Sequence, residues 1–466
     1  MADWRRRIVV LLAVGEVFAF TAAQGQTLNE ALEQAYWNNP TLKAERSALA
    51  AVDLGVTEAL SAWHPTVVSS FGRSRSYLKG HDTDGNRGTA ILPSDQATIT
   101  LSQRVADFGQ TSGAVRAAEA RVLAGRATLA NTEQSVLLDT AQAYLDVVRA
   151  QAGLELNRAN VQILSRQLSA AEAGFDRQMT TQTDVAQAQA RQANALAGRR
   201  QAEEALDSAR GRYATLVGEA AATLAFPQTL PVLPGRDETI GQAESANPTV
   251  LTALFAAEAA RAAVDSSEAT ILPTISFEAS DAYQSNSSIS VRDERTQSIG
   301  LVVRVPLYQS GAEYARVQAR KQELGQRRQL LDAARRSARQ TALETWNSLE
   351  AAQARVKSYD ASVKANQIAQ QGVAAEYMRL GTRTLLDVLN AEQELFEARI
   401  NLIGSRRDEA LAAYRTMAAM GRMTAEALNL AVVRYDATAH YDDVRGRWFG
   451  WGDSTTSAGE RPPPAR

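Results

Sequence analysis

The chain has 466 residues and a formal net charge of −2, so it carries neither the basic field that binds nucleic acid nor a strongly acidic character. It contains no cysteine, which excludes disulfides, thiolate metal sites and a lipid-modified N-terminal cysteine. Its histidines lie far apart, at positions 64, 81 and 440, and no nucleophile, phosphate-loop or metal motif has a plausible context. We therefore expect no catalytic activity, no cofactor and no metal site.

Residues 1–25 have the order of a secretory signal peptide, which is basic, then apolar, then small. Arg5 to Arg7 precede an apolar run from Ile8 to Phe20, and we expect cleavage near Ala23 or Gly25. A membrane anchor is the alternative, but about 13 interrupted apolar residues fall short of the ~20 that a spanning helix needs. No other stretch approaches that length, so the mature chain would have to enter a membrane with strands.

Two helices are expected next, Leu28 to Asn38 and Pro40 to about Trp63, because proline is favoured in a first helical turn. A β-hairpin is expected over 66–106. Its second strand, from Ala97 to Val105, alternates apolar and polar side chains, which is typical of a strand with one apolar face. The loop Gly80 to Asn86 resembles a calcium loop, but its glycine is misplaced and no glutamate closes it, so a solvated loop is favoured.

A long helical hairpin is expected over about 109–217. From Gly109 to about Ala173 there is no proline and little glycine, and ~65 residues at 1.5 Å each predict a rod of roughly 100 Å. Such a rod must lie against others. The polar stretch Arg177 to Asp184 is expected to turn the chain into a returning helix that ends near Val217.

The same pattern recurs about 200 residues later, which indicates a duplication and not a solenoid. Asn39-Pro40 and His64-Pro65 are 25 residues apart, and so are Asn247-Pro248 and Leu272-Pro273. The second copy is expected to contain a β-hairpin over about 271–307 and a helical hairpin over about 311–420, which turns at Arg379 to Asp387. The predicted parts are a signal peptide (1–25), a first structural repeat (26–226), a second structural repeat (235–434) and a C-terminal tail (435–466).

The tail is aromatic and charged from Tyr435 to Trp451, and we expect it to pack against the outside of the helices. Trp448 and Trp451 could be interfacial anchors, but their place after the last returning helix favours the periplasm. From Asp453 onward the composition is typical of disorder.

Four strands per chain cannot close a barrel, and an open sheet edge cannot lie in lipid, so the chain is expected to oligomerise. Three copies would supply twelve strands, enough for a closed barrel around an aqueous lumen lined by polar side chains that include Arg104, Glu278 and Arg304. The predicted fold class is mainly α with β, a membrane β-barrel that continues into a long α-helical barrel. A periplasmic coiled coil without lipid-facing strands is the alternative, and the alternation from Ala97 to Val105 argues against it.

Four sequence stretches carry a resemblance to a known family. They read T-L-N-E-A-L-E-Q-A-Y-W-N-N-P-T-L from Thr27, V-P-L-Y-Q-S-G-A-E-Y-A-R-V from Val305, L-G-T-R-T-L-L-D-V-L-N-A-E-Q-E-L from Leu380 and H-Y-D-D-V-R-G-R-W-F-G from His440. In their order and duplicated spacing they resemble the TolC family of outer-membrane export channels, in particular its type I protein secretion branch. The resemblance implies a homotrimer, with an outer-membrane β-barrel that continues into a long periplasmic α-helical barrel. It also implies that the trimer works with a periplasmic adaptor and an inner-membrane transporter, such as an ABC transporter.

The resemblance also implies a gate at the periplasmic turns, where polar links between the hairpins and a ring of aspartates close the channel. The matching positions are Thr183 and Asp184 in the first hairpin and Arg383 and Asp387 in the second. Three copies of Asp387 around a three-fold axis would attract cations and repel one another. The alternative is that Asp184 and Asp387 are ordinary first-turn residues favoured by the helix dipole and by capping.

Three positions depart from the family pattern. Asn390 stands where some members carry a second ring aspartate, Met378 where a tyrosine helps to lock the hairpins, and Gln178 where the first hairpin has a glycine. These departures bear on the strength of the gate and not on the fold. A lumen lined with Ser and Thr offers no pocket that selects a cargo, so selectivity is expected to reside in the partner transporter. The turn and tail motifs favour type I protein secretion as the function, with multidrug efflux as the alternative.

Overall fold

The computed structural model describes residues 26–81, 87–287, 291–377 and 382–450. The predicted signal peptide, the Asp82–Asn86 part of the calcium-like loop, Met378 and the tail from Trp451 onward lie outside these residues. Within the described ranges, none of the helices combines the length and the apolarity needed to cross a bilayer.

The helices and strands of the described residues follow the expected order twice along the chain. The first set is α1 (Leu28–Asn38), α2 (Pro40–Ser61), β1 (Thr66–His81), β2 (Arg87–Ala106), α3 (Gln110–Asp176) and α4 (Gln182–Val217). The second set is α5 (Arg236–Ala246), α6 (Pro248–Ala269), β3 (Thr274–Ser285), β4 (Asp293–Arg304), α7 (Ala312–Ala375) and α8 (Leu385–Ala419), followed by α9 (Ala439–Val444) in the tail. The chain is thus internally duplicated, as its spacing predicted.

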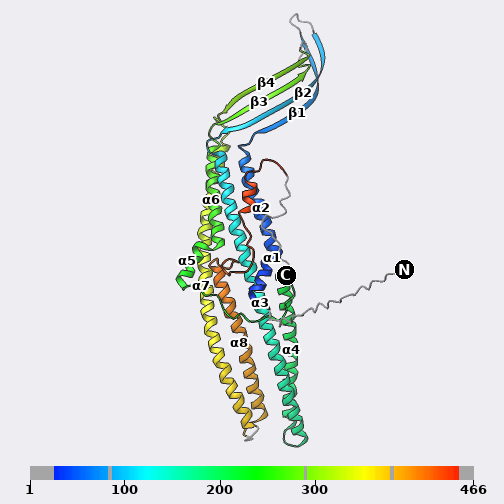
Figure 1. Ribbon diagram of the computed structural model, residues 1–466, viewed down its shortest axis with the longest axis vertical. Helices are drawn as coiled ribbons and strands as arrows, with labels where there is room; N and C mark the ends of the chain where they lie inside the picture. The colour runs from blue at the N-terminus through cyan, green and yellow to red at the C-terminus, as the bar shows by residue number, and fades with distance from the viewer. Residues whose placement is uncertain (1–25, 82–86, 288–290, 378–381, 451–466) are drawn as a thin grey trace, which may run out of the picture.

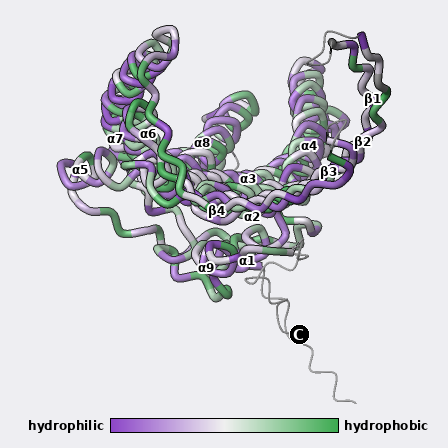
Figure 2. The backbone as a smooth tube through the Cα atoms, turned by 90° about the horizontal axis from the view of Figure 1, so that it is seen from above, coloured by the Kyte–Doolittle hydropathy of each residue, from purple (hydrophilic) through white to green (hydrophobic). Residues whose placement is uncertain are grey.

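The molecule is elongated, with the sheet at one end and the tips of the two helical hairpins at the other (Figure 1). The long helices α3, α4, α7 and α8 run towards the tips, while the shorter helices α1, α2, α5 and α6 lie nearer the sheet. Seen from above, the helices form an open curved layer instead of a closed bundle (Figure 2). One chain therefore forms only part of the circumference of a helical tube.

The four strands form one antiparallel sheet in the order β1-β2-β3-β4, so the two repeats meet at the β2–β3 pair. Side chains that are paired across antiparallel strands share a face. One row across the sheet reads Val67, Leu101, Ala279 and Ile299, and the next reads Thr66, Ser102, Glu278 and Gly300. The alternation expected from the sequence therefore produces one apolar and one polar face across all four strands.

Ion pairs interrupt the apolar face in the half of the sheet that lies away from the helices. Arg73 Nε lies 2.6 Å from Asp95 Oδ1, and Arg295 Nη2 lies 2.6 Å from Asp281 Oδ2. All four residues lie on the same face of the sheet as the apolar row, because each is an even number of positions from the residue of that row in its own strand. The guanidinium of Arg73, in the first strand, is thus paired with a carboxylate on this face.

The junctions between sheet and long helices repeat one backbone turn. Phe108 and Gly109 have positive φ angles of 49° and 117°, and Ser310 and Gly311 have 57° and 76°. Only the first junction has an aspartate before this pair. The Asp107 carboxylate is 1% exposed and accepts hydrogen bonds from the backbone N–H groups of Gly109 (3.3 Å) and Thr111 (2.8 Å) and from the Thr111 hydroxyl.

An Asn-Pro pair at the start of α2 and of α6 ties each repeat together. The Asn39 side chain caps α2 through Thr41 N–H and donates from Nδ2 to Leu216 O at the end of α4 (3.2 Å). Asn247 caps α6 and donates to Ala419 O at the end of α8 (2.9 Å). Because asparagine both donates and accepts, one side chain serves two helix ends.

The largest apolar core joins the beginning and the end of the chain in the middle of the molecule. It includes Leu32, Leu137, Tyr213 and Leu411, from α1, α3, α4 and α8. The Tyr144 hydroxyl lies 2.7 Å from both Gln26 O and Ala225 O, so its one proton serves either backbone acceptor. Segments from the two ends of the chain therefore share one interior.

The tail packs on the outside of the helices, as expected, but it then returns to the sheet. Helix α9 lies against α2, where His440 Nδ1 is 3.0 Å from Asp53 Oδ2. Beyond α9, the Trp448 indole stacks on His64, with ring centroids 4.1 Å apart. His64 lies two residues before the start of β1, so Trp448 lies at the base of the sheet. The chain therefore doubles back after the last returning helix, and its place in the sequence does not by itself put Trp448 far from the sheet.

Candidate periplasmic constriction

The two hairpin tips lie at the same end of the molecule, opposite the sheet (Figure 1). At the first tip α3 ends with two backbone hydrogen bonds, from Gln178 N to Phe175 O (2.9 Å) and from Met179 N to Gly174 O (2.8 Å). This arrangement requires a left-handed residue after the helix, usually glycine. Here that residue is Gln178, with φ of 59°.

Replacing Gln178 with glycine is expected to stabilise the protein slightly, by about 0.5–1 kcal/mol, because glycine adopts this conformation without a Cβ penalty. The midpoint of urea-induced loss of helical circular dichroism measures the effect. Asn429→Gly is the matched control, since Asn429 has φ of 51° in a similar turn and asparagine tolerates the left-handed region better than glutamine. An equal or larger gain for Asn429→Gly would contradict the explanation.

Both returning helices begin with the same capping box. In the first hairpin Asp184 Oδ2 accepts from Thr181 N (2.9 Å) and Thr181 Oγ1 (2.8 Å), and Asp184 N donates back to Thr181 Oγ1 (3.2 Å). In the second, Asp387 Oδ2 accepts from Thr384 N (3.0 Å) and Thr384 Oγ1 (2.9 Å). The backbone N–H of each threonine, followed by its hydroxyl, lowers the pKa of the corresponding aspartate. The capping role considered for these two residues is therefore present, and it keeps both carboxylates negatively charged.

Within one chain, neither Thr183 nor Arg383 forms the expected link between the hairpins. Thr183 is exposed in the first turn of α4. Arg383 donates from Nε to Glu376 Oε2 (2.8 Å), which belongs to its own hairpin. The position of Met378, across the same turn, lies outside the described residues.

A different pair of residues joins the two hairpins. Arg191 Nη2 on α4 donates to Asn390 Oδ1 on α8 at 2.9 Å. Asn390 was predicted as a gate position, but Arg191 was missed. The only signal for it in the sequence is that Arg191 lies three residues after Ala188 and four before Ala195, so it shares a helix face with two small residues. Both alanines are buried, which brings α4 close enough to its neighbours for the contact.

An apolar cluster above the tips supports this contact. Leu385 and Leu389, in the first two turns of α8, pack with Leu164 and Leu168 of α3 and with Ala188 of α4. Leu389 is 1% exposed, so its neighbour Asn390 is held beside α4. The polar residues Arg191 and Asn390 thus lie on helices that pack against each other, and not on loops.

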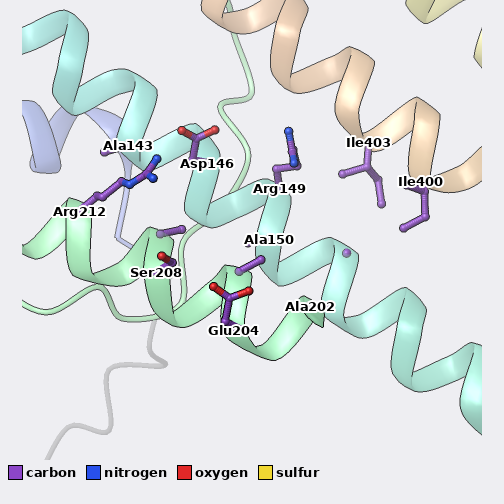
Figure 3. A pocket seen from close by; sticks show the side chains of 13 residues that line it. Ala143, Asp146, Arg149, Ala150, Ala202, Glu204, Ser208, Arg212, Ile400 and Ile403 are labelled. Carbon is purple, nitrogen blue, oxygen red and sulfur yellow. The ribbon is translucent and has the colours of Figure 1, made fainter. Parts of the chain in front are cut away.

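A groove of about 520 Å³ lies higher up, between α3, α4 and α8. Figure 3 shows Asp146 and Arg149 of α3 and Glu204 and Arg212 of α4 around it, with Ile400 and Ile403 on α8. Asp146 is paired with Arg407 at 2.7 Å. The described part of the chain brings together no group of three or more histidine, aspartate or glutamate side chains suited to hold a metal ion.

The three residues predicted to face the lumen share the polar face of the sheet. Arg104 pairs with Ser276, two residues from Glu278 on the same strand face, and Arg304 pairs with Thr274. Arg104 Nη1 also contacts Asp107 Oδ2 at 3.3 Å, so it lies where the sheet meets α3. The register thus brings together three charges that lie up to 200 residues apart in the sequence.

A single sheet with one apolar face, carried on two long helical hairpins, defines an outer-membrane export channel of the TolC type. The chain belongs to the outer membrane efflux protein family, whose model matches residues 31–219 and 239–422, one segment in each repeat. It is 34% identical to the outer membrane efflux protein BepC of Brucella suis over 444 residues, 94% of this chain and 95% of BepC.

Two further relatives bear on the fold and the role. The alkaline protease secretion protein AprF of Pseudomonas aeruginosa is 26% identical over 365 residues, 74% of each chain. The crystal structure of the CmeC outer membrane channel of Campylobacter jejuni superposes with a TM-score of 0.75 at 16% identity, covering 90% of this chain and 89% of CmeC. The protein is thus a channel of the outer membrane that extends into the periplasm, as the sequence predicted.

Proposed function

We propose that the protein is a homotrimer that exports polypeptides by type I secretion, together with a periplasmic adaptor and an inner-membrane ABC transporter. The observation that carries the trimer is the open sheet: β1 and β4 are its two edges, and each exposes an unpaired row of backbone groups that a bilayer cannot satisfy. Joining β1 of one copy to β4 of the next would close a twelve-stranded barrel from three chains.

Type I secretion is supported by the turn and tail motifs and by the similarity to AprF, which is named for protease secretion. Drug efflux is the second candidate, favoured by the higher identity to BepC, which is named an efflux protein. Removing the protein from cells that produce it separates the two. Loss of a protein from the culture medium with unchanged drug susceptibility supports secretion, whereas greater drug susceptibility with an unchanged set of secreted proteins supports efflux.

We further propose that Thr183, Asp184, Arg383, Asp387 and Asn390 form the constriction at the periplasmic end, with the repeats bounded at 26–226 and 235–434. Asp387 is ionised and stands at the tip, so three copies would place three negative charges around the axis. The Arg191–Asn390 bond holds the two hairpins of one chain together and would help to keep this end closed.

Replacing Asp387 with asparagine is expected to reduce cation selectivity in a planar bilayer, because the amide oxygen can still accept from Thr384 N while the charge is lost. Arg191→Ala is expected to raise single-channel conductance, since it frees the hairpins from each other. Asp237→Ala is the control, because Asp237 also lies in the first turn of a helix, α5, but far from the tips. Unchanged conductance and selectivity in both tip variants would contradict the assignment.

A further inference from the structure

The C-terminal tail is fixed along α2 and α3 on its way to the sheet. Besides the His440–Asp53 contact, Thr57 Oγ1 of α2 donates to Val444 O (2.9 Å), and Arg445 Nη2 donates to Glu119 Oε1 of α3 (3.0 Å). Asp53 is 1% exposed, so at least one of these attachments is buried. The residues that follow α9 are therefore held in a defined position along α2 and α3.

These residues lie at the end of the sheet's apolar face that is nearest the helices. Trp448 stacks on His64 with an interplanar angle of 24°, and Gln103 Nε2 of β2 donates to the carbonyl oxygen of Trp63, next to His64, at 3.4 Å. Trp448 thus lies near the level of Gln103, which is flanked on the same strand face by the apolar residues Leu101 and Val105.

The two aromatic residues at this level have little cover in the chain. Phe449 is 88% exposed and Trp448 is 57% exposed, while Val67 and Val105 at the adjoining edge of the sheet are 63% and 55% exposed. The exposed aromatic surface therefore continues the surface that faces lipid. Tryptophan and other aromatic side chains are enriched where a membrane protein passes from hydrocarbon to water, because their rings suit the boundary.

We propose that Trp448 and Phe449 form an interfacial anchor that binds the tail to the phospholipid headgroup region on the periplasmic side of the outer membrane. The anchor would attach each subunit to the bilayer through α9 and α2, in addition to its strands. Its continuity with the apolar face of the sheet favours lipid over a soluble partner. The inference does not depend on what the channel exports.

The absence of cysteine makes the proposal directly testable with a single label. A nitroxide is placed at Phe449→Cys in the full-length trimer, which is then reconstituted in phospholipid nanodiscs. Collision with oxygen, which concentrates in lipid, is compared with collision with a water-soluble nickel chelate. We expect oxygen to be favoured at position 449, whereas Val232→Cys, a control site that is 98% exposed on the loop before α5, should favour the chelate.

A chelate preference at position 449 equal to that at position 232 would overturn the proposal. So would a label that is equally shielded from both reagents in amphipol without lipid, because a neighbouring subunit would then cover it. A second measurement avoids the label: Trp448→Ala/Phe449→Ala is expected to speed tryptic cleavage at Arg445 and Arg447 in nanodiscs but not in amphipol. Equal cleavage of variant and parent in nanodiscs would also count against the anchor.

Discussion

Replacing Gly421 with alanine is expected to lower the free energy of unfolding by about 3–5 kcal/mol, one of the largest effects of any single methyl group in the chain. Gly421 follows α8 with φ of +81°, where an alanine costs about 1–2 kcal/mol. A Cβ there would also lie 2.7 Å from Ala246 O and 3.1 Å from the Cα of Asn247. Both atoms are backbone, so neither can rotate away.

Gly218→Ala is the matched control, because Gly218 ends α4 at the corresponding place, with φ of +88°. Its nearest atom is Asn38 Cβ at 3.6 Å, an ordinary contact, so only the conformational cost of about 1–2 kcal/mol is expected. Urea midpoints of the two variants in the same detergent measure the difference. Equal losses would show that the close approach of the α5–α6 connection contributes nothing.

Replacing Asp107 with alanine is expected to cost about 3–5 kcal/mol, because several donors at the base of the sheet would lose their acceptor. Burial, the largest influence, raises the pKa of this carboxyl, but hydrogen bonds from Thr111, Gly109 and Arg104 together outweigh it and lower the pKa. Gln309→Ala is the control at the second junction. Since Gln309 is exposed, its loss is expected to stay within about 0.5 kcal/mol.

The lowered pKa of Asp107 also predicts a pH dependence. A carboxyl whose pKa is lower in the folded state stabilises the protein above its unfolded value of about 4, and this contribution is lost as the pH falls through the folded value. Stability of the parent should therefore fall below about pH 4 more than that of Asp107→Asn. Parallel acid profiles for parent and variant would contradict an ionised Asp107.

Much of the architecture could be predicted because its signals are local. The alternation from Ala97 to Val105 lies in β2, and the pair at Asn39-Pro40 marks the start of α2. The outer half of the first hairpin was underestimated, since β2 begins at Arg87 and includes Pro93. Charged residues interrupt the apolar alternation there, and their pairing across strands cannot be read from one strand alone.

The tips show the same division between local and distant information. The Thr-x-x-Asp spacing predicts the capping boxes of Asp184 and Asp387, because both partners lie within one turn. The bond from Arg191 to Asn390 joins residues 199 positions apart, so the spacing of Arg191 to its neighbouring alanines cannot identify Asn390 as its partner. The contact of Trp448 with His64 was missed for the same reason.

The shared interior of the two chain ends determines when folding can finish. Tyr36 OH accepts from Tyr435 N at 3.0 Å, and Glu33 Oε1 accepts from Ala431 N at 2.9 Å, across separations of 399 and 398 residues. Contacts at such separations form slowly, because a long loop must close before they contribute. A chain that is exported N-terminus first can form its helical hairpins early. Helix α1 stays partly uncovered until the segment around Ala431 and Tyr435 follows. Truncation after α8 would remove this cover and leave an exposed apolar surface on α1 that favours aggregation.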